Sequence, residues 1–178
     1  MSSLNQKLED AIHHAIKARA NDPASDDESE LYDGDGSLIV TEGGLAIILT
    51  SGTTLDVPIY TGYSEDERKS PCIVVASVDA TADEESPWWY VPATVEVRMG
   101  ADSDSFTPDK WDAMENLSRG LADVIWEPTF IDILSEQSTN FTCHGVKQDE
   151  DRRSRSVEGR TQVASYSRTF FCIEADIE

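Results

Sequence analysis

The stretch VPATVEVRM, residues 91–99, leads after a short turn into TPDKWDAMENLSRGLADVIW, residues 107–126, and these two segments decide the fold class. In the first segment, apolar residues at Val95, Val97 and Met99 alternate with polar ones. Because successive side chains of a strand point to opposite faces, this alternation predicts a strand with one buried face and one wet face.

The second segment has the features of a long helix. Thr107 is a good N-cap, Pro108 suits the first helical position and Asp109 suits the first turn. Pro128 ends the helix soon after Trp126. The apolar stripe at helical spacing consists of Trp111, Met114, Leu117, Leu121 and Ile125. We expect this stripe to pack on the sheet that contains the preceding strand.

The N-terminal part of the chain predicts one helix and then several strands. Residues 4–20 carry apolar side chains at spacings of three and four, which is typical of an amphipathic helix. Three strands are expected within residues 38–60, the first two joined by a turn at Glu42-Gly43-Gly44. Pro58 favours an edge position for the third of them, since proline cannot donate to a strand ladder.

Outside these segments, residues 71–78, 140–147 and 161–174 each predict a strand, and the short run 130–134 is ambiguous. Strands gathered before and after one central helix favour an α+β fold. We expect a mixed, mainly antiparallel sheet packed against the N-terminal helix and the long central helix, with an extra β-hairpin.

The chain of 178 residues fits a single domain, residues 1–178. Residues 21–37 lack basic residues and have few apolar ones, so we expect a poorly ordered acidic loop there. Together with the strands that follow, residues 21–60 look like an addition to the domain. Residues 148–160, at the other end, are expected to form a charged arm between two long strands.

The formal net charge is −21, from 35 Asp and Glu against 14 Lys and Arg. Such a balance argues against DNA wrapping and against binding to a membrane surface, because both need clustered cations. It suits basic partners, or a surface that repels nucleic acid. Solubility or a high-salt habitat explains the charge equally well.

Nothing in the sequence predicts an enzyme, a cofactor site or a metal site. Phosphate-binding glycine loops and a nucleophile elbow are both missing. The adjacent His13 and His14 are expected to point in different directions on their helix, and Cys143 and His144 to opposite sides of a strand. The three cysteines, Cys72, Cys143 and Cys172, are expected to be reduced, buried thiols, which implies synthesis in a reducing cytoplasm.

Two groups of residues are candidates for a contact with another subunit or a partner protein. Trp88 and Trp89 begin a strand, so one should be core and the other an exposed interface anchor, although both could simply close the core. The second group is the set of arginines in the charged arm, which suits docking on an acidic neighbour, with a solvated hairpin tip as the alternative. This group consists of Arg152, Arg153, Arg155 and Arg160.

The order of elements resembles the tail-terminator and tail-completion proteins of long-tailed bacteriophages, which join head to tail. The resemblance rests on the helix LNQKLEDAIHHAIKAR, the strand PCIVVASV, and VPATVEVRM leading directly into the central helix. A final strand pair, FTCHGVK and SRTFFCIEADI, is separated by the charged arm. The resemblance covers roughly residues 4–20 and 71–177.

This resemblance implies a structural virion protein without catalytic residues or cofactor. Such proteins form rings, commonly hexamers, at the head-proximal end of the tail, where the ring stops growth of the tail tube and joins the capsid connector. The expected partners are therefore further copies of the chain, the tail tube protein and a head connector or neck protein. DNA would pass through the ring without specific binding, and no membrane is involved. The protein would reside in the host cytoplasm and then in the virion.

Two other readings remain open on the sequence. An acidic binding module, such as a DNA-mimic inhibitor of a basic enzyme, is supported by the net charge. A small hydrolase or metal enzyme has no supporting motif. The oligomeric state separates a mimic from a ring, because a mimic is expected to be a monomer or dimer.

Overall fold

The computed structural model describes residues 3–21, 31, 32, 34, 37–62, 70–100, 106–136 and 141–174. The expectation of a poorly ordered segment at residues 21–37 falls mostly outside these residues. Of its C-terminal part, Leu31 is buried in the core and Tyr32 packs against that core. No helix in the described ranges is long and apolar enough to cross a membrane.

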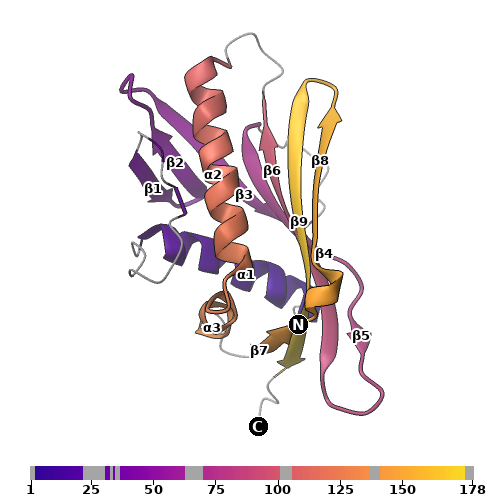
Figure 1. The fold of residues 1–178 in the computed structure, drawn as a ribbon. Coiled ribbons are helices and arrows are strands. Elements are labelled where there is room, and N and C mark those ends of the chain that lie inside the picture. The colour runs from indigo at the N-terminus through magenta and orange to yellow at the C-terminus, as the bar shows by residue number, and fades with distance from the viewer. Residues whose placement is uncertain are drawn as a thin grey trace.

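Three α-helices and nine strands make up the described part of the chain, in an α+β arrangement (Figure 1). The helices are α1 (Leu4–Asn21), α2 (Pro108–Trp126) and α3 (Phe130–Glu136), and η1 (Gln148–Glu150) is a short 3₁₀ turn. The strands are β1 (Ser37–Thr41), β2 (Gly44–Ile48), β3 (Thr54–Thr61), β4 (Cys72–Ser77), β5 (Thr81–Ala82), β6 (Trp89–Met99), β7 (Phe141–Val146), β8 (Arg152–Glu158) and β9 (Thr161–Glu174).

The strands form one sheet in the order β1-β2-β3-β4-β6-β9-β7. The short strand β5 pairs with β6, and β8 pairs with β9. Only β3 and β4 run parallel among the described pairs. The predicted mixed, mainly antiparallel sheet is therefore confirmed.

The helices cover one face of the sheet, and the core lies between the helices and that face (Figure 1). Val95, Val97 and Met99 of β6 are buried there, as their alternation predicted. From α2, Leu117 and Leu121 are fully buried in the same core. The expected packing of α2 on this sheet is confirmed.

The start of α2 also follows the sequence, with one difference. Thr107 has the extended backbone of an N-cap, and Pro108 opens the helix. The Thr107 hydroxyl, however, hydrogen-bonds the Asp109 carboxylate instead of a backbone amide of the first turn. The Thr107 side chain therefore does not cap a backbone amide of the helix as expected.

The expectation that Pro58 places its strand at an edge is wrong. β3 lies between β2 and β4. Pro58 is the last residue paired with β2, opposite Gly44, and pairing with β4 begins one residue later at Ile59. The proline thus lies where the strand changes partner, so its missing amide removes no ladder hydrogen bond on the β4 side.

The segment expected to form a charged arm between two strands is itself mostly a strand of the sheet. Residues 152–158 form β8, which pairs with β9 along its whole length, from Arg152 opposite Ser167 to Glu158 opposite Thr161. The C-terminal half of β9 pairs with β7 on the same side. β8 is consequently an edge strand of the sheet. The ambiguous run 130–134 belongs to α3, which buries Phe130 and Leu134 at a helical spacing of four.

Candidate interaction surfaces

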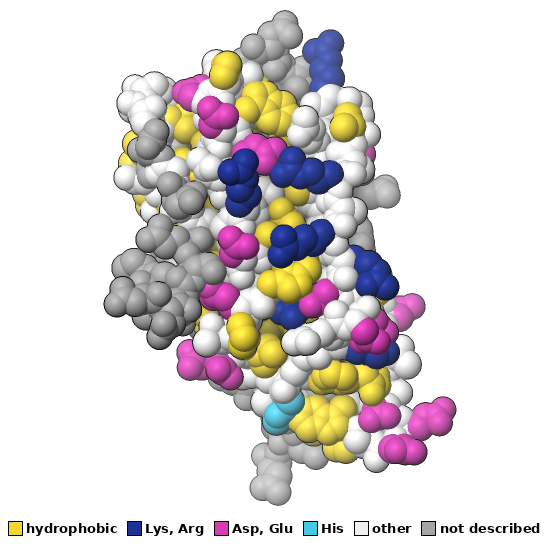
Figure 2. Space-filling view, viewed as in Figure 1, with side chains coloured by type: hydrophobic (Ala, Val, Ile, Leu, Met, Phe, Trp, Pro, Cys, Tyr) yellow, Lys and Arg dark blue, Asp and Glu magenta, His cyan; other side chains and the backbone are white. Residues whose placement is uncertain are grey.

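A groove with arginine side chains runs between α2 and β8. Because strand side chains alternate, Arg153 and Arg155 share the face of β8 that lies toward α2. Figure 2 shows the dark blue Lys and Arg side chains gathered in a band over this part of the molecule. The groove has a volume of about 460 Å³. Its lining consists of Arg119, Ala122, Asp123, Arg153, Ser154, Arg155 and Tyr166. We call it the α2–β8 groove.

Arg155 links β8 to α2 across this groove through a bidentate ion pair with Glu115. Its Nη1 donates to Oε1 of Glu115 at 2.9 Å, and its Nη2 donates to Oε2 at 2.7 Å. This hydrogen bonding, assisted by the charge of Arg119, holds the pKa of the Glu115 carboxyl below its usual value. The same contact raises the pKa of Arg155. Such a fork suits guanidinium geometry and gives β8 a defined position on α2.

Arg153 is held by an aromatic ring instead of a carboxylate. Its guanidinium carbon lies 4.4 Å from the centroid of the Trp126 ring. A cation over an indole face is attracted by the ring quadrupole, and the guanidinium edges remain able to donate hydrogen bonds. Arg119 is exposed on α2, and it lines the groove with Arg153. The α2–β8 groove therefore presents cations on a strongly acidic chain.

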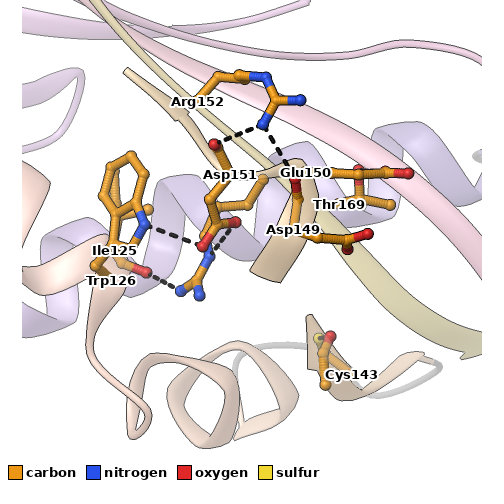
Figure 3. Close-up of polar contacts among 10 residues, drawn as sticks. Ile125, Trp126, Cys143, Asp149, Glu150, Asp151, Arg152 and Thr169 are labelled. Atoms are coloured by element: carbon orange, nitrogen blue, oxygen red, sulfur yellow. Dashed lines mark hydrogen bonds and ion pairs between the residues drawn. The ribbon is translucent and has the colours of Figure 1, made fainter. Parts of the chain in front are cut away.

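Beneath Arg153, a polar network ties β8 and β9 to the end of α2 (Figure 3). The Asp151 carboxylate accepts from the Trp126 indole at 3.0 Å and from Nε of Arg168 at 3.0 Å. Arg168 also donates through Nη1 to the carbonyl of Ile125 at 2.7 Å. A buried cation at the C-terminal end of a helix satisfies free carbonyls and complements the helix dipole. This network fixes the indole on which Arg153 stacks.

The four predicted arginines thus fall into separate places. Arg153 and Arg155 lie together in the α2–β8 groove. Arg152 is on the other face of β8, where its guanidinium donates to the carbonyls of Asp149 and Asp151. Arg160 lies in the turn between β8 and β9, beyond the end of the groove.

The groove also depends on residues that the sequence did not single out. Arg119 and Glu115 are one turn apart on α2, in a pattern that is ordinary for an exposed helix face. These residues approach β8 only in the folded structure, across a long sequence separation. The spacing of residues along the chain therefore does not predict the groove.

The tryptophan prediction is right for the exposed residue and wrong for the core one, since Trp89 is exposed but Trp88 is only half-buried and not core. Trp89 is 40% exposed. Trp88 is half-buried and lies edge-on against His144, with ring centroids 3.9 Å apart. Trp89 pairs with Ala82 of β5 and Trp88 immediately precedes it, so both lie at the end of the sheet that carries β5. Figure 1 shows β5 away from α2. Trp89 shares the face of β6 that carries the buried Val91, but the helices do not extend over this end of the sheet. Trp88 points to the opposite, uncovered face, so both side chains stay partly open to solvent.

The histidine pair on α1 also differs from the expectation. The His13 and His14 rings stack nearly parallel, with centroids 5.2 Å apart and planes 7° apart. Burial lowers the pKa of His13, and the charges of His14 and Lys17 lower it further. The lowered pKa of His13 favours its neutral form in this stack.

The three cysteines are buried thiols, as expected. Cys143 and Cys172 lie directly opposite each other on β7 and β9. A hydrogen bond between them lowers the pKa of Cys143 and, together with burial, raises the pKa of Cys172. In the described ranges, no cluster of three or more His, Cys, Asp or Glu side chains is placed to hold a metal ion.

Comparison with models of known protein families and with curated protein sequences gives no match for this chain.

Proposed function

We propose that this chain is a structural virion protein that forms a ring at the head-proximal end of a phage tail, where it terminates the tail tube and meets the capsid connector. The order of elements supports this proposal, because the N-terminal helix, the sheet and the central helix follow one another as the resemblance implies. The fold class agrees with it as well. The proposal assigns the chain no catalytic role.

The α2–β8 groove is the observation that carries the proposal. It presents Arg119, Arg153 and Arg155 on a chain with a net charge of −21, so a second copy offers it abundant carboxylates. Exposed acidic residues also flank β5, at the end of the sheet opposite the β8–β9 turn (Figure 1). A cationic surface in one place and an anionic surface in another favour head-to-tail contacts, which close into rings when the rotation allows.

In such a ring we expect the bore to be acidic. DNA passes through the channel, and like charge prevents it from adhering. Those acidic residues around β5 that the contact between copies leaves free are candidates for that lining, from the set Asp79, Asp83, Glu84 and Glu85. The other acidic segment expected to contribute, residues 26–35, lies largely outside the described residues.

Native mass spectrometry tests the proposal. We expect a single closed assembly, with six copies as the leading stoichiometry, that dissociates as salt is raised because its charged contacts are screened. The double variant Arg119→Gln and Arg153→Gln should weaken the assembly. The control Lys7→Gln and Lys17→Gln makes the same change in net charge on α1, and it should assemble like the parent.

Two results count against the ring. A chain that stays monomeric or dimeric at all concentrations contradicts it, and tight binding of that monomer to a basic DNA-binding enzyme would favour the DNA-mimic alternative. Equal loss of assembly in both double variants would mean that total charge, and not the α2–β8 groove, governs association.

A further inference from the structure

Four aromatic side chains line a recess at the end of the sheet that carries β5. Trp88 immediately precedes β6, Tyr90 is in β6, His144 is in β7 and Phe171 is in β9. The Trp88 and His144 rings meet edge-on, with planes at 88°. The Tyr90 and Phe171 rings meet at 65°, with centroids 4.7 Å apart. We call this group the aromatic recess.

The aromatic recess opens on the face of the sheet that the helices leave uncovered. Val91 and Phe170, which adjoin Tyr90 and Phe171 along their strands, are buried in the helix-covered core. Because adjacent strand residues point to opposite faces, Tyr90 and Phe171 point away from that core. The recess has a volume of about 240 Å³. Partly exposed aromatic groups gathered in this way are typical of a binding site.

The rim of the aromatic recess is acidic. Asp83 belongs to its lining, and Glu84 and Glu85 are exposed beside it. The Asp83 carboxylate is held by the Ser86 hydroxyl at 2.6 Å, and its backbone amide donates to the Trp88 carbonyl at 2.9 Å. The turn between β5 and β6 therefore fixes a carboxylate next to the Trp88 ring. Figure 2 shows acidic side chains to one side of a hydrophobic group at the lower right of the view.

One ring of the recess already attracts a cation from the same chain. The Lys147 ammonium lies 5.6 Å from the centroid of Tyr90. Glu150 pairs with that ammonium at 2.5 Å, and this hydrogen bond lowers the pKa of the Glu150 carboxyl. Because Glu150 compensates the charge of Lys147, this lysine offers little repulsion to a second cation that enters from the Asp83 side.

We propose that the aromatic recess binds an arginine side chain of a basic partner protein. A guanidinium is planar, so it stacks on the Trp88 or Tyr90 ring while its edge forks to the Asp83 carboxylate. Net charge favours the same class of partner, because a chain at −21 attracts basic proteins. The site lies apart from the α2–β8 groove and does not depend on ring formation.

The test uses the full chain and the peptide acetyl-Gly-Arg-Gly-amide, followed through the indole N–H resonance of Trp88 in NMR spectra. Loss of one indole signal in Trp88→Phe assigns that resonance. A citrulline peptide of the same shape, without the charge, is the matched ligand. We expect saturable shifts of Trp88 with the arginine peptide, at an affinity on the order of millimolar, and none with the citrulline peptide.

Two variants should weaken binding, each by about two- to fivefold, as expected for a cation over a partly exposed ring or beside a partly exposed carboxylate. They are Trp88→Leu and Asp83→Asn, the first followed through the Tyr90 ring resonances. Trp111→Leu is the control, because Trp111 lies in the first turns of α2, where it packs against Phe106 and not against the recess. The control should bind the peptide like the parent.

Three outcomes overturn the proposal. Equal shifts with the citrulline peptide would make the aromatic recess an apolar site with no preference for a cation. Unchanged binding in Asp83→Asn together with Trp88→Leu would place the peptide elsewhere. A Trp88 shift that grows with protein concentration in the absence of peptide would make a second copy of this chain the occupant. The first two results leave the ring untested, whereas the third is a self-association that native mass spectrometry would also detect.

Discussion

Asp151 and Arg168 form an ion pair whose side chains are only 13% and 4% exposed, with 3.0 Å between the carboxylate oxygen and Nε. Removing one partner of such a pair leaves a buried charge uncompensated, which costs about 3–5 kcal/mol. We therefore expect Asp151→Ala to lower the free energy of unfolding by about that amount in urea denaturation. Asp149→Ala, an exposed change two residues away, should stay within about 0.5 kcal/mol of the parent. Similar midpoints for the two variants would mean that the network beneath Arg153 contributes no stability.

The pair of Glu115 and Arg155 should give stability that depends on pH. The pKa of Glu115 is lowered in the folded chain from an ordinary value of 4.5. A lowered folded pKa stabilises the fold above that ordinary value, and the contribution disappears as pH falls through the lowered pKa. A double-mutant cycle with Glu115→Gln and Arg155→Gln should therefore give a coupling of about 0.5–1 kcal/mol at pH 7 and none in strong acid. A coupling that is the same at both pH values would contradict the ion pair.

Truncating the apolar stripe of α2 should be costly. Leu121 is fully buried, so Leu121→Ala should lower the free energy of unfolding by about 2–5 kcal/mol through lost burial and a residual cavity. Val157→Ala removes two methyl groups from a side chain that is 69% exposed on β8, and it should be nearly neutral. Denaturant midpoints measure both, and a near-neutral Leu121→Ala would show that the stripe is not core.

The two glycines of the β1–β2 turn should respond differently to alanine. Gly44 has φ +155°, and a Cβ there would lie 2.6 Å from the amide nitrogen of Ile59 and 2.7 Å from the carbonyl oxygen of Val57. These are backbone atoms of β3, so the strand itself would have to shift, and we expect a cost of about 2–4 kcal/mol for Gly44→Ala. A Cβ at Gly43 meets nothing within 4 Å. Gly43→Ala should therefore leave the melting temperature nearly unchanged.

Apolar periodicity and capping residues in the sequence predicted the helices and strands that are set by neighbouring residues in the chain. The alternation in 91–99 and the proline-started stripe in 107–126 each describe one element and the face that it buries, and both were confirmed. The same reasoning failed at Pro58, because a strand can exchange one neighbour for another at a proline without being at an edge. That exchange is a property of the sheet and not of the strand.

The interaction surfaces were less accessible from the sequence for a similar reason. Strand β8 has no apolar alternation, and it is ordered by pairing with β9 and by contacts of Arg153 and Arg155 with α2. Those contacts join positions about 30 to 40 residues apart, where spacing has no predictive value. Tyr90 and Phe171 were likewise read only as strand residues, although their opposition across β6 and β9 makes one wall of the aromatic recess.

Because β3 changes its partner strand at Pro58, the sheet consists of two parts that are joined by only a few paired residues. β1, β2 and the first half of β3 form a meander, and only Ile59, Tyr60 and Thr61 pair it with β4. β6 and β9, by contrast, are paired over eleven residues. Native-state hydrogen exchange should therefore separate two cooperative units, with the amides of β1 and β2 opening at a lower free energy than those of β6 and β9. The meander would then unzip first under a pulling force, while the strands that carry the α2–β8 groove stay closed.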